Sequence, residues 1–344
     1  MLVLKESEVR SLVTGLSADD IKEYQDVLLD SLIEYYHNRS ILPPRIVTTT
    51  PYATHLFMAS TGSAVGMKAL TGSGNGFAGL TTILDKFQGF PVGILNASTL
   101  TAFRTALCTT LALVKAFPLD NSAIGGTLIC YGVGAQAEWH IRLTLQLFSG
   151  RFSKVVIANR TVSKADSLVT LLRQEFKQVP IEAHGIGDGK ELAKQYEDAS
   201  VIYSCVPSTS PTVLDFQIEQ CRRSKVFIGA IGSYKPQMIE IDGDLIKKEC
   251  LDKGGRVIVD SVTDCLAEAG EFILNDIGKE SLVELASIYL DDPPEDAQKQ
   301  LQYLKTGRVV ICKLVGLCIM DISVGSFVLK QAERRHIGTL IEGF

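Results

Sequence analysis

The chain has 344 residues, of which 46% are hydrophobic and 21% are charged. This length suits about two domains, and the composition excludes disordered, fibrous and low-complexity proteins. The 34 basic and 39 acidic residues give a formal net charge of −5. Because nucleic-acid-binding proteins usually carry a basic surplus, we expect no nucleic-acid partner.

The eight cysteines are scattered, with neither a CxxC pair nor the Cys/His spacing of a zinc site. We interpret them as reduced thiols of a cytoplasmic protein that holds no metal. The apolar run at the N-terminus is too short for a signal-peptide core. Residues 309–329 are long and apolar enough to span a bilayer but contain Lys313 and Asp321. We therefore expect no membrane contact and predict one buried helix there, at a domain or subunit contact.

The hydrophobic pattern changes along the chain. Residues 19–38 predict an amphipathic helix, and residues 46–95, rich in Thr, Ser, Gly and β-formers, predict a mainly antiparallel sheet. From residue 127 onward, short apolar runs alternate with helix-length segments, which is typical of a parallel, doubly wound sheet. These runs cover residues 127–133, 154–159, 181–186, 201–206, 225–231 and 256–260. The predicted class is therefore α/β, with a Rossmann domain in the region that begins near residue 127.

The strongest local signal follows the first of these runs. The predicted strand ends in Gly132 and Gly134, and a helical pattern begins with Ala135 and Gln136. Backbone N–H groups at such a helix start can meet a pyrophosphate without side-chain obstruction, which predicts a dinucleotide site. Ala137 replaces the third glycine of the usual fingerprint, so the alternative is a tight turn without a ligand.

The end of the second run bears on which dinucleotide binds. NAD sites commonly have a carboxylate there for the ribose 2′-hydroxyl, whereas an arginine can hold a 2′-phosphate. Here the run ends in Asn159, Arg160 and Thr161, with no carboxylate. This favours NADP(H) over NAD(H). The alternative is that Arg160 is a solvated loop residue.

At this point the chain resembles the ornithine cyclodeaminase/mu-crystallin family over nearly its whole length. The order and spacing of the matching stretches carry the resemblance, and the stretches are 43–45, 66–68, 100–106, 132–137, 159–161, 232–236, 259–261 and 268–270. It implies a homodimer, a nicotinamide cofactor and a small amino or imino acid as substrate. It also implies that residues 1–118 with 306–344 form an α+β substrate-binding and dimerisation domain around a Rossmann domain of residues 119–305. Ser233 is an expected further cofactor contact.

Arg45, Lys68 and Arg104 are the candidate substrate-binding and catalytic residues. A substrate carboxylate is held best by the planar, bidentate donors of Arg, and an ammonium adds a compact second charge. Two prolines stiffen the approach of Arg45, and Lys68 lies in an apolar stretch where an unpaired charge is costly. The family resemblance implies that all three positions line the substrate pocket. The alternative for each is a structural salt bridge or a solvated position.

One departure from the family pattern bears on the reaction. In the cyclodeaminases, the loop at 232–236 carries an aspartate that handles the substrate amine, whereas here it contains Ser233 and Tyr234 and no carboxylate. Departures at 96–97 and 313–314 suggest an unusual substrate.

The resemblance therefore implies a ketimine reductase-like enzyme, which uses NADPH to reduce a small cyclic imine or α-imino acid at the C=N bond. Lys68 either holds the carboxylate or supplies a proton. The alternatives are an NAD(P)-dependent amino-acid dehydrogenase, an ornithine cyclodeaminase, or a non-catalytic NADPH-regulated small-molecule-binding protein of the mu-crystallin type.

Overall fold

The computed structural model describes residues 1–74, 76–120, 123–187 and 189–344. They form two compact units: unit 1 comprises Met1–Cys108 and Gly316–Phe344, and unit 2 comprises Thr109–Val315. The predicted α/β class with a parallel Rossmann-type sheet is confirmed. The units change at 108 and 316, whereas the sequence placed its boundaries at 118 and 306. The second boundary lies later because strand β14 (Val309–Lys313) pairs within the sheet of unit 2.

Unit 1 is built on a seven-stranded sheet of order β15-β1-β6-β5-β4-β3-β2. Its strands are β1 (Leu2–Leu4), β2 (Ile46–Thr49), β3 (Ala53–Thr61), β4 (Val65–Ser73), β5 (Gly76–Leu84), β6 (Pro91–Asn96) and β15 (Thr339–Leu340). Strands β2 to β6 are antiparallel neighbours, as predicted for residues 46–95. The helices are α1 (Glu6–Val13), α2 (Ala18–His37), the first half of α3 (Ala97–Ala116) and α12 (Cys318–Arg334), with a 3-10 turn at Arg39–Ile41.

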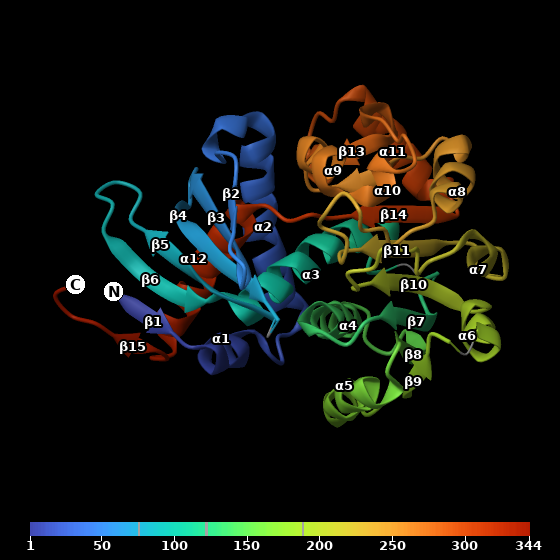
Figure 1. Cartoon of the computed structure of the whole chain (residues 1–344), viewed down its shortest axis with the longest axis horizontal. Coiled ribbons are helices and arrows are strands. Elements are labelled where there is room, and N and C mark those ends of the chain that lie inside the picture. Colours follow the sequence, from blue (N-terminus) through green and yellow to red (C-terminus); the bar gives the residue numbers. More distant parts are fainter. Residues whose placement is uncertain (75, 121–122, 188) are drawn as a thin grey trace. The chain divides into compact units, whose positions relative to one another are not determined.

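Helix α2 corresponds to the helix predicted at residues 19–38. Its start is fixed by a capping box, in which Ser17 Oγ accepts the N–H of Asp20 and the Asp20 carboxylate accepts the N–H of Ser17. Helix α12 packs against α2 and against strands β3, β4 and β5, which places it on one face of the sheet (Figure 1).

Alternation along the strands gives this sheet two different faces. Met58, Lys68 and Thr81 stand opposite one another on β3, β4 and β5. Lys68 and Thr81 are 1% and 0% exposed, so this row lies on the covered face. The adjacent row, which contains Phe57 and Leu80, points the other way and leaves these two side chains 42% and 39% exposed. One face of the sheet is therefore covered, and the other leaves apolar side chains exposed.

Unit 2 is built on an eight-stranded sheet of order β13-β12-β14-β11-β10-β7-β8-β9, in which all paired strands are parallel. Its strands are β7 (Gly126–Tyr131), β8 (Phe152–Asn159), β9 (Ile181–Gly185), β10 (Ala199–Ser204), β11 (Val226–Ala230), β12 (Val257–Val259), β13 (Leu282–Glu284) and β14. The six predicted runs correspond to β7 to β12.

Helices and short turns connect these strands, as expected for a doubly wound sheet (Figure 1). The helices are α4 (Ala135–Leu147), α5 (Val162–Glu175), α6 (Gly189–Tyr196), α7 (Asp215–Glu219), α8 (Gly243–Leu245), α9 (Val262–Glu268), α10 (Gly270–Ile273) and α11 (Glu295–Thr306). A π-helical turn covers Ile246–Cys250, and 3-10 turns cover Leu251–Lys253, Lys279–Ser281 and Leu285–Tyr289.

The predicted single helix over residues 309–329 is wrong. The segment forms strand β14 and then, after Gly316 at a φ of +89°, the first part of helix α12. Strand β14 lies between β11 and β12 and is buried along its whole length. A strand buried on both faces has a continuous apolar sequence, which periodicity alone does not distinguish from a buried helix.

Helix α3 is the one described helix that is long and apolar enough to cross a membrane, and 83% of its most apolar window is buried. This burial is typical of a core helix.

Candidate functional site

The glycine loop predicted to bind a dinucleotide has the backbone geometry that this role needs. Gly132 has a φ of +104°, and a Cβ atom there would lie 2.8 Å from the carbonyl oxygen of Cys205. Gly134 caps α4 without a side-chain hydrogen bond, and nothing lies within 4 Å of the position of its Cβ. The first glycine is therefore required by the turn, and the second keeps the space before the helix N-terminus open.

The first turn of α4 also fits a bound ligand. Ala135 is exposed, whereas Ala137 is completely buried, so the methyl group that replaces the third glycine is accommodated in the core. The Oε1 atom of Gln136 is buried and has no hydrogen-bond partner among the described residues. Such an orphaned acceptor is unusual in a native protein, and it is consistent with a ligand that donates a hydrogen bond there.

The residues predicted to select the nucleotide follow β8, the neighbour of β7 in the sheet. Asn159 is half-buried, and its Nδ2 donates to the carbonyl oxygen of Thr161 at 2.9 Å. This hydrogen bond shapes the turn that carries Arg160. Arg160 is exposed, and neither an ion pair nor a side-chain hydrogen bond is recorded for it within the described residues. Its guanidinium is therefore accessible to an anion.

Ser233, the other predicted cofactor contact, is completely buried. Its hydroxyl lies 2.6 and 2.8 Å from the two carboxylate oxygens of Glu271, to which it donates, and its N–H donates to Glu240 Oε2 at 2.8 Å. Lys313 Nζ donates to its carbonyl oxygen at 2.7 Å. The polar groups of Ser233 are thus engaged inside unit 2, and this residue shapes its loop from within.

The groups around Ser233 form a buried ionic cluster that fixes the end of β11. Burial raises the pKa of Glu240; Lys313 opposes this rise, and the neighbouring carboxylate of Glu271 adds to it. For Lys313, burial disfavours the charged form, but Glu271 and Glu240 outweigh it and raise the pKa. Glu240 accepts the N–H of Ser233 and Glu271 accepts its hydroxyl, so both carboxylates are structural partners of the loop.

In unit 1, the structure brings two of the three predicted cationic residues onto one carboxylate. Lys68 Nζ donates to Asp321 Oδ1 at 2.6 Å, and Arg104 Nε lies 3.2 Å from Asp321 Oδ2. Lys68 comes from β4, Arg104 from α3 and Asp321 from the first turn of α12. Their side chains are 1%, 6% and 0% exposed. This is a buried ionic cluster with a positive surplus.

Arg45 approaches the same part of unit 1. Its Nη2 donates to the carbonyl oxygen of Gly316 at 3.2 Å, and a Cβ atom on Gly316 would lie 3.0 Å from both terminal nitrogens of Arg104. Arg45 and Arg104 therefore meet around one glycine. The structure brings all three predicted cations together within unit 1.

The environment of Lys68 changes its acid–base behaviour. Burial lowers its pKa to about 8; Arg104 adds to this effect, and Asp321 opposes it. An ammonium with a pKa of about 8 is still mostly protonated at neutral pH and releases its proton much more readily than an ordinary lysine.

Asp321 is the member of this cluster that the sequence-based search for site residues missed. The sequence signal was present, because an aspartate within an apolar run needs a partner when it is buried. We used that charge only to exclude a membrane span. Its partners lie 253 and 217 positions earlier in the chain, and spacing along the chain does not identify such pairs.

His140, near the glycine loop, is a structural residue. Its Nδ1 lies 2.7 Å from the carbonyl oxygen of Gln136, and its Nε2 lies 2.8 Å from Thr109 Oγ1. Burial lowers its pKa to about 4, so it is neutral at physiological pH and both nitrogens are engaged.

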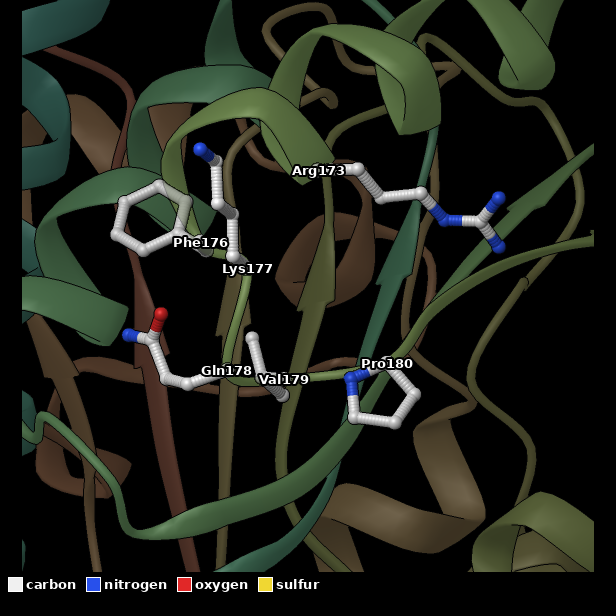
Figure 2. Close-up of a pocket in the computed structure, with 6 residues that line it drawn as sticks. All are labelled: Arg173, Phe176, Lys177, Gln178, Val179 and Pro180. Atoms are coloured by element: carbon white, nitrogen blue, oxygen red, sulfur yellow. The ribbon is translucent and has the colours of Figure 1, made fainter.

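Figure 2 shows a hollow of unit 2 that is separate from the glycine loop. It is lined by Arg173, Phe176, Lys177, Gln178, Val179 and Pro180. It lies between the end of α5 and the start of β9, at the amino end of that strand. Ligands of doubly wound sheets bind beyond the carboxyl ends of the strands. Arg173 Nε donates to the carbonyl oxygen of Ile181 at 2.9 Å, so we assign this hollow no ligand.

Comparisons with known proteins agree with the fold. A model of the ornithine cyclodeaminase/mu-crystallin family matches residues 75–335. An uncharacterised protein of Saccharomyces cerevisiae is 28% identical over 94% of this chain and 95% of its own length. Delta(1)-pyrroline-2-carboxylate reductase of Bacillus cereus is 28% identical over 99% of this chain and 100% of its own. The solved structure of Thermococcus litoralis Delta(1)-pyrroline-2-carboxylate reductase with NADH and L-proline has a TM-score of 0.77 at 17% identity, covering 99% of this chain and 100% of that one.

Proposed function

The chain belongs to the ornithine cyclodeaminase/mu-crystallin family, and we propose that it is an NADPH-dependent reductase of a small cyclic imine or α-imino acid. The observation that carries this proposal is the buried cluster of Lys68, Arg104 and Asp321, whose positive surplus suits a substrate carboxylate. The similarity to a pyrroline-2-carboxylate reductase along the full chain supports the same substrate class.

In the proposed reaction, the chain's own residues bind and orient the substrate. Arg104 and Arg45 hold the carboxylate and thereby fix the position of the C=N carbon. Much of the rate enhancement then comes from this positioning. Bound NADPH supplies the hydride. The imine nitrogen takes up a proton, for which the ammonium of Lys68 is the proposed source.

A cofactor-oxidation screen tests this function directly. The purified protein is mixed with NADH or NADPH in parallel, against Δ1-pyrroline-2-carboxylate, its six-membered homologue, and 2-oxo acids with amines. We expect NADPH oxidation with the cyclic imino acids. Ammonia release from ornithine without net cofactor change would identify a cyclodeaminase instead. Tight NADPH binding without turnover of any of these compounds would identify a binding protein.

The reductase is favoured over a cyclodeaminase by the loop that follows β11. Residues 232–236 contain no carboxylate, and the nearby Glu240 and Glu271 are completely buried and bonded to the loop itself. An enzyme that recognises the distal ammonium of ornithine needs an accessible acid. The reductase reaction does not.

The preference for NADPH over NADH rests on Arg160 and on the absence of a carboxylate at Asn159. Replacing Arg160 with Ala should weaken NADPH binding by about 1.5 to 3 kcal/mol, the usual value of a hydrogen bond to a charged group. NADH binding should barely change, because NADH has no 2′-phosphate. Fluorescence titration with both cofactors measures the two effects, and an equal loss for both would contradict the assignment.

The proposed assembly is a homodimer formed through the uncovered face of the unit 1 sheet. This face carries Ile46, Phe57, Met67, Leu80 and Val92, which are 62%, 42%, 42%, 39% and 38% exposed. Their register places the side chains together, opposite the face that contains Lys68. A contiguous apolar patch of this kind is typical of an interface between subunits.

We expect sedimentation velocity to show a dimer at micromolar concentration, and the double variant Met67→Asp/Leu80→Asp to be monomeric, because two carboxylates would be buried unpaired in an apolar contact. Phe216→Asp, at an exposed aromatic of unit 2, is the matched control and should remain dimeric. A wild-type protein that sediments as a stable monomer would exclude this assembly.

The proposed location is the cytoplasm. All eight cysteines lie in the described part of the chain and are free thiols there. Unpaired thiols suit a reducing compartment. Microscopy of a fluorescently tagged chain tests this location.

A further inference from the structure

Asp321 is fully buried, and its two carboxylate oxygens face two different cations. Oδ1 accepts a hydrogen bond from Lys68 at 2.6 Å, and Oδ2 lies 3.2 Å from Arg104 Nε. The second pair is close but not aligned for a hydrogen bond, since both Arg104 Nε and Asp321 Oδ2 are without a hydrogen-bond partner among the described residues. A carboxylate that served only to stabilise the fold would be expected to make aligned bonds with both cations.

Asp321 approaches Arg104 from one side of the guanidinium only. The terminal nitrogens lie beside Gly316, where a Cβ atom would lie 3.0 Å from each of them. Nη1 also lies 3.2 Å from the sulfur of Met320, a weak acceptor. The Nη1/Nη2 edge, which can bind a carboxylate with two parallel hydrogen bonds, therefore faces no carboxylate among the described residues.

The charges of the cluster lead to the same conclusion. Lys68 and Arg104 together carry two positive charges and Asp321 carries one negative charge, so the buried set has a surplus of one. Burying an unpaired charge is costly, and one bound carboxylate would remove the surplus. The first turn of α12, where Asp321 lies, adds the positive end of a helix dipole. With the partly buried Arg45 nearby, the site therefore suits an additional anion.

We propose that Asp321 is a positioning residue of the substrate site, which holds Lys68 and the Nε side of Arg104 so that the terminal nitrogens of Arg104 bind the substrate carboxylate. This inference rests on the proposed function, because it takes the anion to be the carboxylate of the imine. Asp321 itself touches no reacting atom.

The groups that face Lys68 from each neighbouring element are few. Helix α12 contributes Asp321 and the thiol of Cys318, and helix α3 contributes Arg104. The strand neighbours Met58 and Thr81 are uncharged. Asp321 opposes the lowering of the Lys68 pKa, whereas Arg104 adds to it. Removing the carboxylate should therefore lower the pKa of Lys68 below about 8, its value in the intact cluster.

The test compares Asp321→Asn with the wild type by two independent measurements. The first is an NMR titration of [13C]lysine-labelled protein, in which the Lys68 signal is identified by its absence in Lys68→Met. The second is the steady-state reduction of Δ1-pyrroline-2-carboxylate over a range of pH. Glu333→Gln, at an exposed acid of the same helix, is the matched control. NADPH binding and the melting temperature verify that each variant is folded.

We expect Asp321→Asn to titrate Lys68 at lower pH, to raise KM about tenfold or more, and to shift the high-pH decrease of kcat to lower pH. Asp321→Glu, which restores the charge one methylene away, should restore the wild-type titration of Lys68. Its KM should return only part of the way to the wild-type value. An unchanged KM and an unchanged Lys68 titration in Asp321→Asn would overturn the proposal.

Two other outcomes are also decisive. If Asp321→Asn does not fold, Asp321→Glu is compared alone, and a wild-type KM in that variant overturns the positioning role.

If the wild type reduces no imine, the proposed function fails separately. The titration then still reports the coupling of Asp321 to Lys68, and binding of pyrrole-2-carboxylate, a planar carboxylate that is not reduced, tests the anion site. Equal affinity in the wild type and Asp321→Asn would overturn the inference.

Discussion

Replacing Arg104 with Met should lower kcat/KM for a cyclic imino acid by about 3 kcal/mol or more, roughly two orders of magnitude, because a charge-assisted bidentate contact is lost in a buried site. Arg104 is 5% exposed, so little water is present to replace its hydrogen bonds. Met keeps an unbranched apolar chain in place of the aliphatic part of Arg. Asp321 keeps Lys68 as its partner, at 2.6 Å, so the variant leaves no isolated buried carboxylate.

The controls for this prediction separate loss of the contact from loss of the fold. NADPH affinity should barely change, since the glycine loop and Arg160 belong to unit 2 and Arg104 belongs to unit 1. Arg334→Met, at an exposed arginine of α12, should behave as the wild type. Arg45→Met should also reduce kcat/KM, but less than Arg104→Met, because Arg45 is only partly buried.

A change in the substrate completes this test. A substrate analogue with a carboxamide in place of the carboxylate should be reduced only slowly by the wild type. Arg104→Met should lower kcat/KM for this analogue much less than it lowers kcat/KM for the carboxylate substrate. If the wild type reduces carboxylate and carboxamide substrates equally well, neither arginine holds a carboxylate, and the assignment to imino acids is wrong.

The parts of the structure that follow from local rules were predictable from the sequence. The strand, the two glycines and the helix start at residues 128–136 are consecutive, so their chemistry is visible without tertiary information. The same holds for α2, whose capping box and periodicity define it. Strand β14 was missed because complete burial removes the alternation that identifies a strand.

The candidate site was predictable only in part. Each of its cations is recognisable by residue type, but their grouping depends on strand register and helix packing. Lys68 faces α12 because it shares a row with Met58 and Thr81 on the covered side of the sheet. A shift of one residue would turn it outward. The burial of a charge at Asp321 was foreseeable, but its partners Lys68 and Arg104 were not, since they lie far away in the chain.

The role of Lys68 can be decided by the pH dependence of the Lys68→Met variant. If Lys68 donates the proton, wild-type kcat requires the ammonium form and falls as pH rises through the pKa of this group. That pKa is about 8 in the free protein, and a bound substrate carboxylate should raise it by stabilising the positive charge. Lys68→Met should then have a low kcat with no high-pH decrease, because no titrating donor is left.

If Lys68 instead holds the carboxylate, Lys68→Met should raise KM at every pH and leave the shape of the kcat profile as it is in the wild type. Steady-state kinetics between pH 6 and about 10, a range that extends on both sides of the Lys68 pKa of about 8, distinguishes the two roles with one variant and one substrate. Asp321 keeps its neighbour Arg104 at 3.2 Å in this variant, so the carboxylate stays paired. A variant with wild-type kcat and KM at all pH values would remove Lys68 from the reaction and leave it as a structural partner of Asp321.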